Sequence, residues 1–144
     1  MSFNRLGFTR VEVLLSVSIV TNLVAIALPI YSGYVNHSRA SRAASDLVAL
    51  SLELENAFQK NLVYPEYAAG TVIPAVPENR AGPLSVDFPA WAPAEGTYFT
   101  YSVSSTAASY IVTATEQGNL NCTISLTNHN VRTATGTDCG FTKW

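Results

Sequence analysis

Gly7-Phe8-Thr9-Arg10-Val11-Glu12 opens the stretch that decides the fold, and residues 13–38 after it carry no Asp, Glu, Lys or Arg. A cut after the small residue Gly7 would leave the apolar segment on the mature protein. As a helix, residues 11–30 would measure about 30 Å, the thickness of the hydrocarbon core of a bilayer. Glu12 lies at the edge of this segment, where an unpaired charge is costly and calls for a partner.

The flanking sequence predicts an orientation. Arg5 and Arg10 precede the apolar run and favour a cytoplasmic N-terminus, so the remainder would face the periplasm or the outside. A conventional secretory signal, cut at Ala25-Ile26-Ala27, is the alternative. Against it, the helical spacing of apolar residues continues beyond that cut, at Ala40, Ala43, Leu47, Leu50, Leu54 and Phe58.

The first hexapeptide, the apolar run and Ala27-Leu28-Pro29-Ile30-Tyr31 together resemble the N-terminus of a type IV pilin. The resemblance implies that residues 1–7 are a leader peptide, removed by a prepilin peptidase that also methylates Phe8. It implies that Glu12 pairs with the Phe8 amine of a neighbouring subunit, and that Pro29 is the proline of the assembly helix. Residues 8–30 would then form the transmembrane and filament-core helix, and residues 31–144 the globular domain.

The sequence departs from the usual pilin pattern at two places. Arg10 stands where an apolar residue is customary, two positions from Glu12, and it could compete for that carboxylate or answer one on another subunit. Thr21 and Asn22 occupy a place where apolar sequence containing glycine is usual.

The rest of the chain predicts an α+β domain: a long N-terminal helix packed on an antiparallel β-meander of three or four strands. The amphipathic half of the helix covers residues 31–62 and ends before Tyr64-Pro65. A proline-rich connecting loop is expected over 63–96, and the sheet and disulfide region over 97–144. The expected strands are 97–103, 110–115, 120–126 and a short one at 131–135.

Cys122 and Cys139 are the two cysteines of the chain, and both lie in the part predicted to face an oxidising compartment. We therefore expect a disulfide between them. In type IV pilins such a bridge bounds a surface segment used for contacts. A metal site is not expected, because two further ligands are missing nearby.

No arrangement of residues suggests catalysis, so we expect neither an enzyme nor a cofactor. The resemblance implies a structural or minor subunit of a type IV pilus, serving adhesion, twitching motility or DNA uptake. Its partners would be copies of itself or other pilins in a helical filament, the prepilin peptidase, the inner-membrane assembly machinery, and DNA or a host surface. It would reside in the inner membrane before assembly and in the extracellular pilus afterwards.

Three alternatives stay open at this point. The first is a DNA-binding minor pilin for natural transformation, with Arg80, Arg132 and Lys143 contacting phosphates beside Phe141 and Trp144. The net charge of −2 and the sequence pI near 5.6 give no global attraction toward nucleic acid, so such a patch would have to act locally. The second is a pseudopilin of type II secretion, which shares the same N-terminus. The third is a secreted domain released at Ala27.

Overall fold

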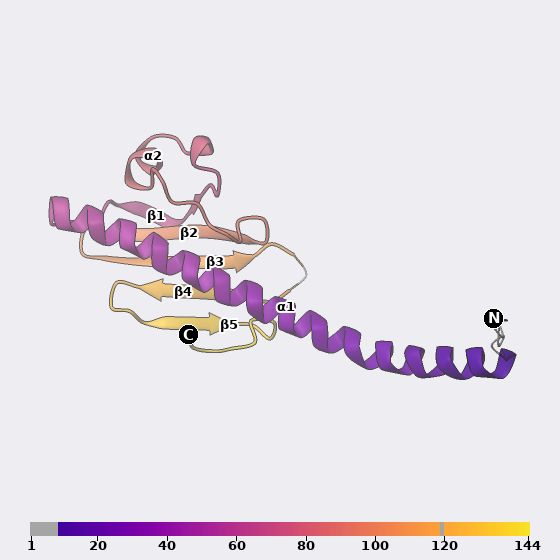
Figure 1. The fold of residues 1–144 in the computed structure, drawn as a ribbon. Helices are drawn as coiled ribbons and strands as arrows, with labels where there is room; N and C mark the ends of the chain where they lie inside the picture. Colours follow the sequence, from indigo (N-terminus) through magenta and orange to yellow (C-terminus); the bar gives the residue numbers. More distant parts are fainter. Residues whose placement is uncertain (1–8, 119) are drawn as a thin grey trace, which may run out of the picture. The chain divides into compact units, whose positions relative to one another are not determined.

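The computed structural model describes residues 9–118 and 120–144. Its elements follow one another along the chain as a long helix, a first strand, an irregular region with two short helices, and the other strands of the sheet (Figure 1). They are α1 (Arg10–Asn61), β1 (Tyr67–Ile73), the 3-10 helix η1 (Pro77–Asn79), α2 (Pro83–Asp87), β2 (Phe99–Thr106), β3 (Ser109–Glu116), β4 (Thr123–Thr127) and β5 (Arg132–Thr135). The predicted α+β class, with a long helix on an antiparallel sheet and a disulfide between Cys122 and Cys139, is confirmed.

The chain divides into two compact units, Met1–Tyr34 and Val35–Trp144. In the first unit, the described part is the beginning of α1, which Thr9 caps: its Oγ1 accepts from the N–H of Glu12 at 3.3 Å, and its carbonyl from that of Val13 at 3.2 Å. A threonine before the helix and a glutamate three residues later form a helix-start signature. The side chains of residues 10–27 are exposed, and α1 is long and apolar enough to cross a membrane.

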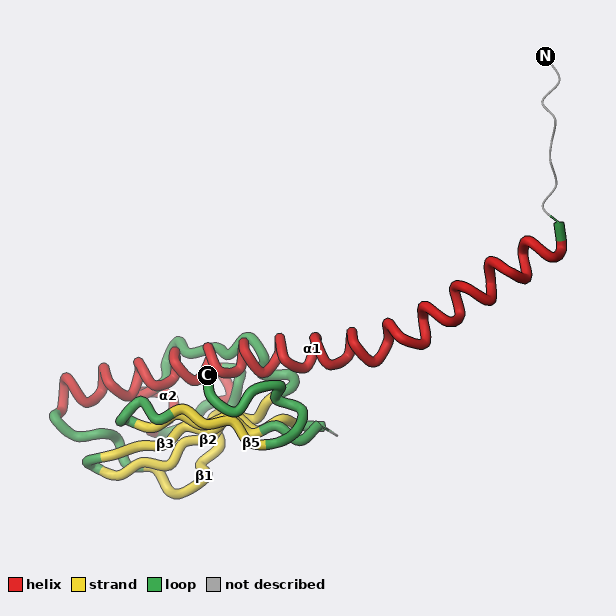
Figure 2. Tube along the Cα trace, turned by 90° about the horizontal axis from the view of Figure 1, so that it is seen from below, coloured by secondary structure: helices red, strands yellow, loops and turns green. Residues whose placement is uncertain are grey.

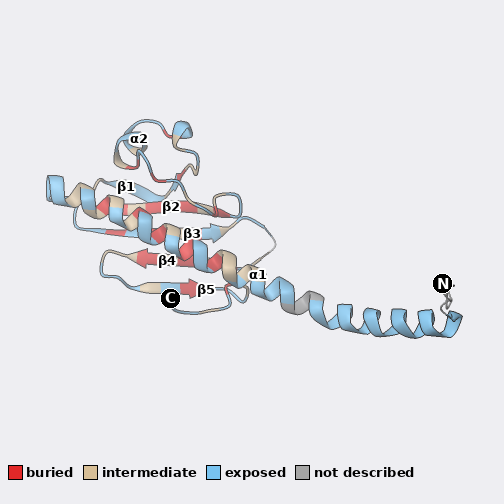
Figure 3. Cartoon of the chain, in the orientation of Figure 1, coloured by how far each residue is buried: buried red, intermediate tan, exposed pale blue. Residues whose placement is uncertain are grey.

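In the second unit, the remainder of α1 lies across one face of the sheet, giving two layers (Figure 2). Its buried residues recur every three or four positions, as the sequence predicts, and Figure 3 shows buried segments interleaved with exposed ones along this part of the helix. They are Ala40, Ala43, Ala44, Leu47, Leu50 and Leu54.

The sheet has the order β1-β2-β3-β4-β5, every pair antiparallel. Along β2 to β5 the side chains alternate between the core and solvent, and the outward ones are mostly Ser and Thr. The inward positions of β2 include both Phe99 and Tyr101, while β3 turns Tyr110 inward and leaves Ile111 40% exposed. Ile124 is buried, as expected.

The sheet has five strands, whereas three or four were expected. The additional strand, β1, lies inside the stretch 63–96 that the sequence suggests is a loop. That stretch also holds η1 and α2. Sequence alternation does not mark β1, since its register against β2 shifts between Tyr67 and Thr71. Gly70 stands in this bulge with φ +74°.

Helix α1 ends at Asn61, and Leu62 takes a left-handed conformation with φ 60°. The following turn is tied back to the helix through Glu55. Its carboxylate accepts hydrogen bonds from the hydroxyls of Tyr64 at 3.1 Å and Tyr110 at 3.0 Å. Burial and this carboxylate raise the pKa of both tyrosines above the ordinary value of 10.

Candidate functional site

A groove of about 390 Å³ separates α1 from the C-terminal segment in the second unit. Three parts of the chain line it. Helix α1 contributes His37, Ser41, Ala44, Ser45 and Val48, strand β5 contributes Arg132, and the C-terminal segment contributes Phe141, Lys143 and Trp144. Two lining residues, Arg132 and Lys143, are basic, three carry aromatic rings, and none is Asp or Glu.

The helix side of the groove follows from spacing. His37, Ser41 and Ser45 are four residues apart and therefore lie on one face of α1. The Ser45 hydroxyl donates to the Ser41 carbonyl at 3.2 Å. Sequence reasoning missed these three residues, although their spacing places them together. It could not show that the C-terminal segment lies opposite them.

The C-terminal segment is fixed to the sheet at three points. The disulfide joins Cys139 to Cys122, with Cα atoms 4.9 Å apart. The N–H of Ala134 in β5 donates to the carbonyl of Thr142 at 3.0 Å, so the segment covers the edge of the sheet. The indole N–H of Trp144 donates to the carbonyl of Thr133 at 3.2 Å.

Gly140 brings this segment against α1. It adopts φ +75°, and a Cβ added to it would lie 2.8 Å from Cδ2 of His37. The next residue, Phe141, meets the His37 ring edge-on, with centroids 5.5 Å apart. A larger residue at 140 would therefore push the segment away from the helix and open the groove.

Arg132 lies beside an indole at the groove. The guanidinium carbon of Arg132 is 4.9 Å from the centroid of the Trp144 ring, and its Nε–H donates to Oδ1 of Asn130 at 2.8 Å. In the part of the chain that the structure describes, neither Arg132 nor Lys143 has a carboxylate partner within 4 Å; the one ion pair there joins Arg42 to Glu95. Arg132 and Lys143 are therefore available to an external anion.

Arg80 does not belong to this site, which corrects its predicted role as a third phosphate contact. It is 6% exposed, and its guanidinium donates to the carbonyls of Pro74, Ala75, Phe88 and Trp91 at 2.6–3.3 Å. Burial lowers the pKa of Arg80 from its ordinary value. Its donors hold the proline-rich connection between β1 and β2 in place.

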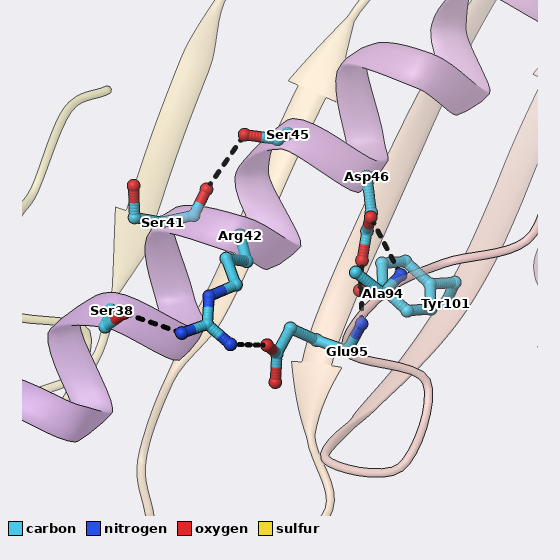
Figure 4. Close-up of polar contacts among 8 residues, drawn as sticks. All are labelled: Ser38, Ser41, Arg42, Ser45, Asp46, Ala94, Glu95 and Tyr101. Atoms are coloured by element: carbon cyan, nitrogen blue, oxygen red, sulfur yellow. Dashed lines mark hydrogen bonds and ion pairs between the residues drawn. The ribbon is translucent and has the colours of Figure 1, made fainter.

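A second polar cluster fastens the same connection to α1 (Figure 4). The Asp46 carboxylate accepts from the N–H groups of Ala94 and Glu95 at 3.0 and 3.1 Å, and from the Tyr101 hydroxyl at 2.6 Å. Burial and this carboxylate raise the pKa of Tyr101 far above 10. Arg42 adds a bond to Glu95 at 2.8 Å. The cluster keeps α1 at a fixed position relative to the sheet and so fixes one wall of the groove.

The predicted assembly residues all fall in the first unit. Gly7 and Phe8 fall outside the described residues. Glu12 is exposed in the first turn of α1, where a negative charge interacts favourably with the helix dipole. Pro29 lies within the helical span of α1.

Residues 29–127 match the protein family described as "Type IV minor pilin ComP, DNA uptake sequence receptor". The match covers more than half of the chain and stops before β5 and the C-terminal wall of the groove. A curated relative, the "Type IV major fimbrial protein FimA" of Dichelobacter nodosus, is 29% identical over 104 residues. That alignment covers 62% of this chain and 66% of the relative, just under two thirds of its length. No solved structure matches.

Proposed function

Since this chain belongs to the family of the type IV minor pilin ComP, described as a DNA uptake sequence receptor, we propose that it is a pilus subunit that binds double-stranded DNA through the groove between α1 and the C-terminal segment. The observation that carries this proposal is the juxtaposition of Arg132, Lys143 and Trp144 with no Asp or Glu among the lining residues. Two unpaired cations on a rigid frame suit successive phosphates of one strand.

The groove supplies three kinds of contact to a phosphate backbone. Arg132 offers a planar fork of N–H donors and Lys143 a point charge. The hydroxyl of Ser41 is a further donor on the opposite wall, whereas the Ser45 hydroxyl donates to the Ser41 carbonyl. Since the whole chain carries a net charge of −2, attraction of DNA is confined to this region, and moderate affinity with a shallow salt dependence is expected.

We also propose how the subunit is processed and assembled. The prepilin peptidase cuts after Gly7 and methylates Phe8, and the inner-membrane machinery then extracts the chain and packs residues 8–30 into the filament core. Glu12 receives the Phe8 amine of the neighbouring subunit during this step. The exposed apolar beginning of α1 supports an anchor in the inner membrane and a filament core afterwards. The mature subunit is then displayed on the extracellular pilus with its groove available for DNA.

The test is DNA binding by the full chain in neutral detergent micelles. Fluorescence anisotropy of a labelled duplex is measured across a salt series for the wild type, Arg132→Gln, Lys143→Gln and the control Lys60→Gln, an exposed residue of α1 outside the groove. Each groove variant should weaken binding and reduce the slope of log affinity against log salt by about 1. The control should not. Equal losses in all three variants, or an affinity independent of salt, would count against the proposal.

A further inference from the structure

Two hydroxyl side chains in the apolar beginning of α1, those of Ser16 and Thr21, bond within their own helix. Ser16 Oγ donates to the carbonyl of Glu12 at 2.7 Å. Thr21 Oγ1 lies 3.0 Å from the carbonyls of both Val17 and Ser18. A hydroxyl has one proton to donate, so these side chains are satisfied and suit a hydrocarbon environment.

Asn22 is different, because its carboxamide has more hydrogen-bonding capacity than the helix uses. Its Nδ2 donates to the carbonyl of Ser18 at 2.7 Å, and the side chain is exposed. A carboxamide carries two N–H groups and an acceptor oxygen. Among the residues that the structure describes, the second N–H and the oxygen have no partner.

Asn22 would lie too deep in the membrane for water to hydrogen-bond its second N–H and its oxygen. It lies near the middle of the apolar stretch 11–30, roughly 15 Å from either surface of the hydrocarbon core. A side chain this short cannot reach the headgroups, as Lys or Arg can. The remaining donor and acceptor therefore need another protein chain, because lipid tails offer neither.

A second copy of this chain supplies the matching groups. All copies insert with the same orientation, so two neighbouring α1 helices place their Asn22 side chains at the same depth. A carboxamide is self-complementary, and each Asn22 can donate its second N–H to the oxygen of the other around a twofold axis. Ser18 and Ala25, one turn away on either side, are small enough to let the two backbones approach.

We infer that Asn22 is the polar contact through which two copies of this chain associate inside the membrane, before assembly into a filament. The inference rests on the proposed function, because it requires residues 8–30 to lie in a bilayer. The Asn22 contact lies near the middle of the membrane, whereas the proposed contact between Glu12 and Phe8 lies at its edge. A pilin with an apolar residue at this depth could not replace the second copy.

The experiment measures self-association of the full chain in lipid vesicles by energy transfer between donor-labelled and acceptor-labelled copies. Four chains are compared: the wild type, Asn22→Leu, Asn22→Gln and Thr21→Val. Asn22→Leu keeps the size and removes the carboxamide, and it should weaken the dimer about 3- to 30-fold. Asn22→Gln retains the carboxamide and should restore most of the association. Thr21→Val removes the neighbouring polar group, whose donor is already satisfied, and should leave the dimer unchanged.

Each other result overturns the inference in a recognisable way. If the wild type is inserted but monomeric, or if Asn22→Leu associates as well as the wild type, the inference fails while the anchor stands. If Thr21→Val weakens self-association as much as Asn22→Leu, the contact is not specific to Asn22 and the inference fails. If the wild-type chain is extracted from membranes by carbonate, the membrane part of the proposed function fails with it. Non-reducing gels confirm that every variant keeps its disulfide.

Discussion

Gly140 lies against the imidazole of His37, so closely that an added Cβ would come within 2.8 Å of Cδ2. This contact joins the C-terminal segment to α1 and determines the width of the groove. It depends on two properties of glycine at once, the absence of a side chain and the ease of a φ of +75°.

Substitution of Gly140 should therefore destabilise the domain and weaken DNA binding together. We expect Gly140→Ala to lower the free energy of unfolding by about 1–3 kcal/mol, measured by denaturant titration. Gly70→Ala is the matched control, because Gly70 has nearly the same φ, +74°, with nothing within 4 Å of an added Cβ. It should show the backbone cost alone and retain DNA affinity. Equal DNA affinity in the two variants would contradict the assigned role of Gly140.

Arg80→Lys should separate stability from binding. An ammonium group cannot reach the four carbonyls that the guanidinium contacts, so buried acceptors lose their partners. We expect the free energy of unfolding to fall by about 2–4 kcal/mol. DNA affinity, measured where the variant is folded, should match the wild type. A selective loss of affinity with normal stability would return Arg80 to the binding site.

Alkaline pH should destabilise the domain through its buried tyrosines. The pKa values of Tyr67, Tyr101 and Tyr110 are raised above 10 in the folded chain, chiefly by burial. The folded state therefore holds protons that the unfolded state releases, and stability falls as the pH rises above about 10. The unfolding midpoint followed from about pH 8 to pH 11 measures this effect.

Tyr101→Phe should make that pH dependence shallower, because it removes one of the raised groups, although it also removes the hydrogen bond to Asp46. Its stability at neutral pH should drop by about 1 kcal/mol. Tyr34→Phe, at a tyrosine that is 72% exposed, is the control and should leave the curve unchanged. A curve for Tyr101→Phe that parallels the wild type would contradict the assignment.

Mass spectrometry of the chain purified from membranes should find a methylated N-terminal Phe8. The measurement decides between the two cleavages that the sequence allows. A mature chain beginning at Leu28 would instead indicate a secretory signal, and would remove the filament-core helix. Gly7→Ile, which blocks a cut after a small residue, should leave the leader attached.

Periodicity and turn chemistry were enough to predict most of the fold. The spacing from Ala40 to Leu54 marks the buried face of α1, and alternation marks β2 to β5. Strand β1 was not predicted, because a bulge around Gly70 interrupts the alternation of inward and outward side chains by which a strand is recognised.

The site was predictable in part. Arg132, Lys143 and Trp144 are close in sequence, so a shared patch could be proposed from the sequence alone. Composition cannot distinguish an arginine that meets solvent from one that is buried against carbonyls, which is why Arg80 was assigned to that patch. The opposite wall depends on a contact between residues 37 and 141, and a separation of this size carries no local signal.

The match to the minor pilin family ends at residue 127, whereas the C-terminal wall of the groove lies between residues 132 and 144. The disulfide crosses this boundary, because Cys122 lies inside the matched region and Cys139 beyond it. The C-terminal segment therefore lies outside the part of the chain that matches the family, yet it is bonded covalently to that part and contributes Cys139 to the core. A graft of the last seventeen residues of another member would transfer the wall of the groove, provided that it keeps the core residues Ala134 and Cys139.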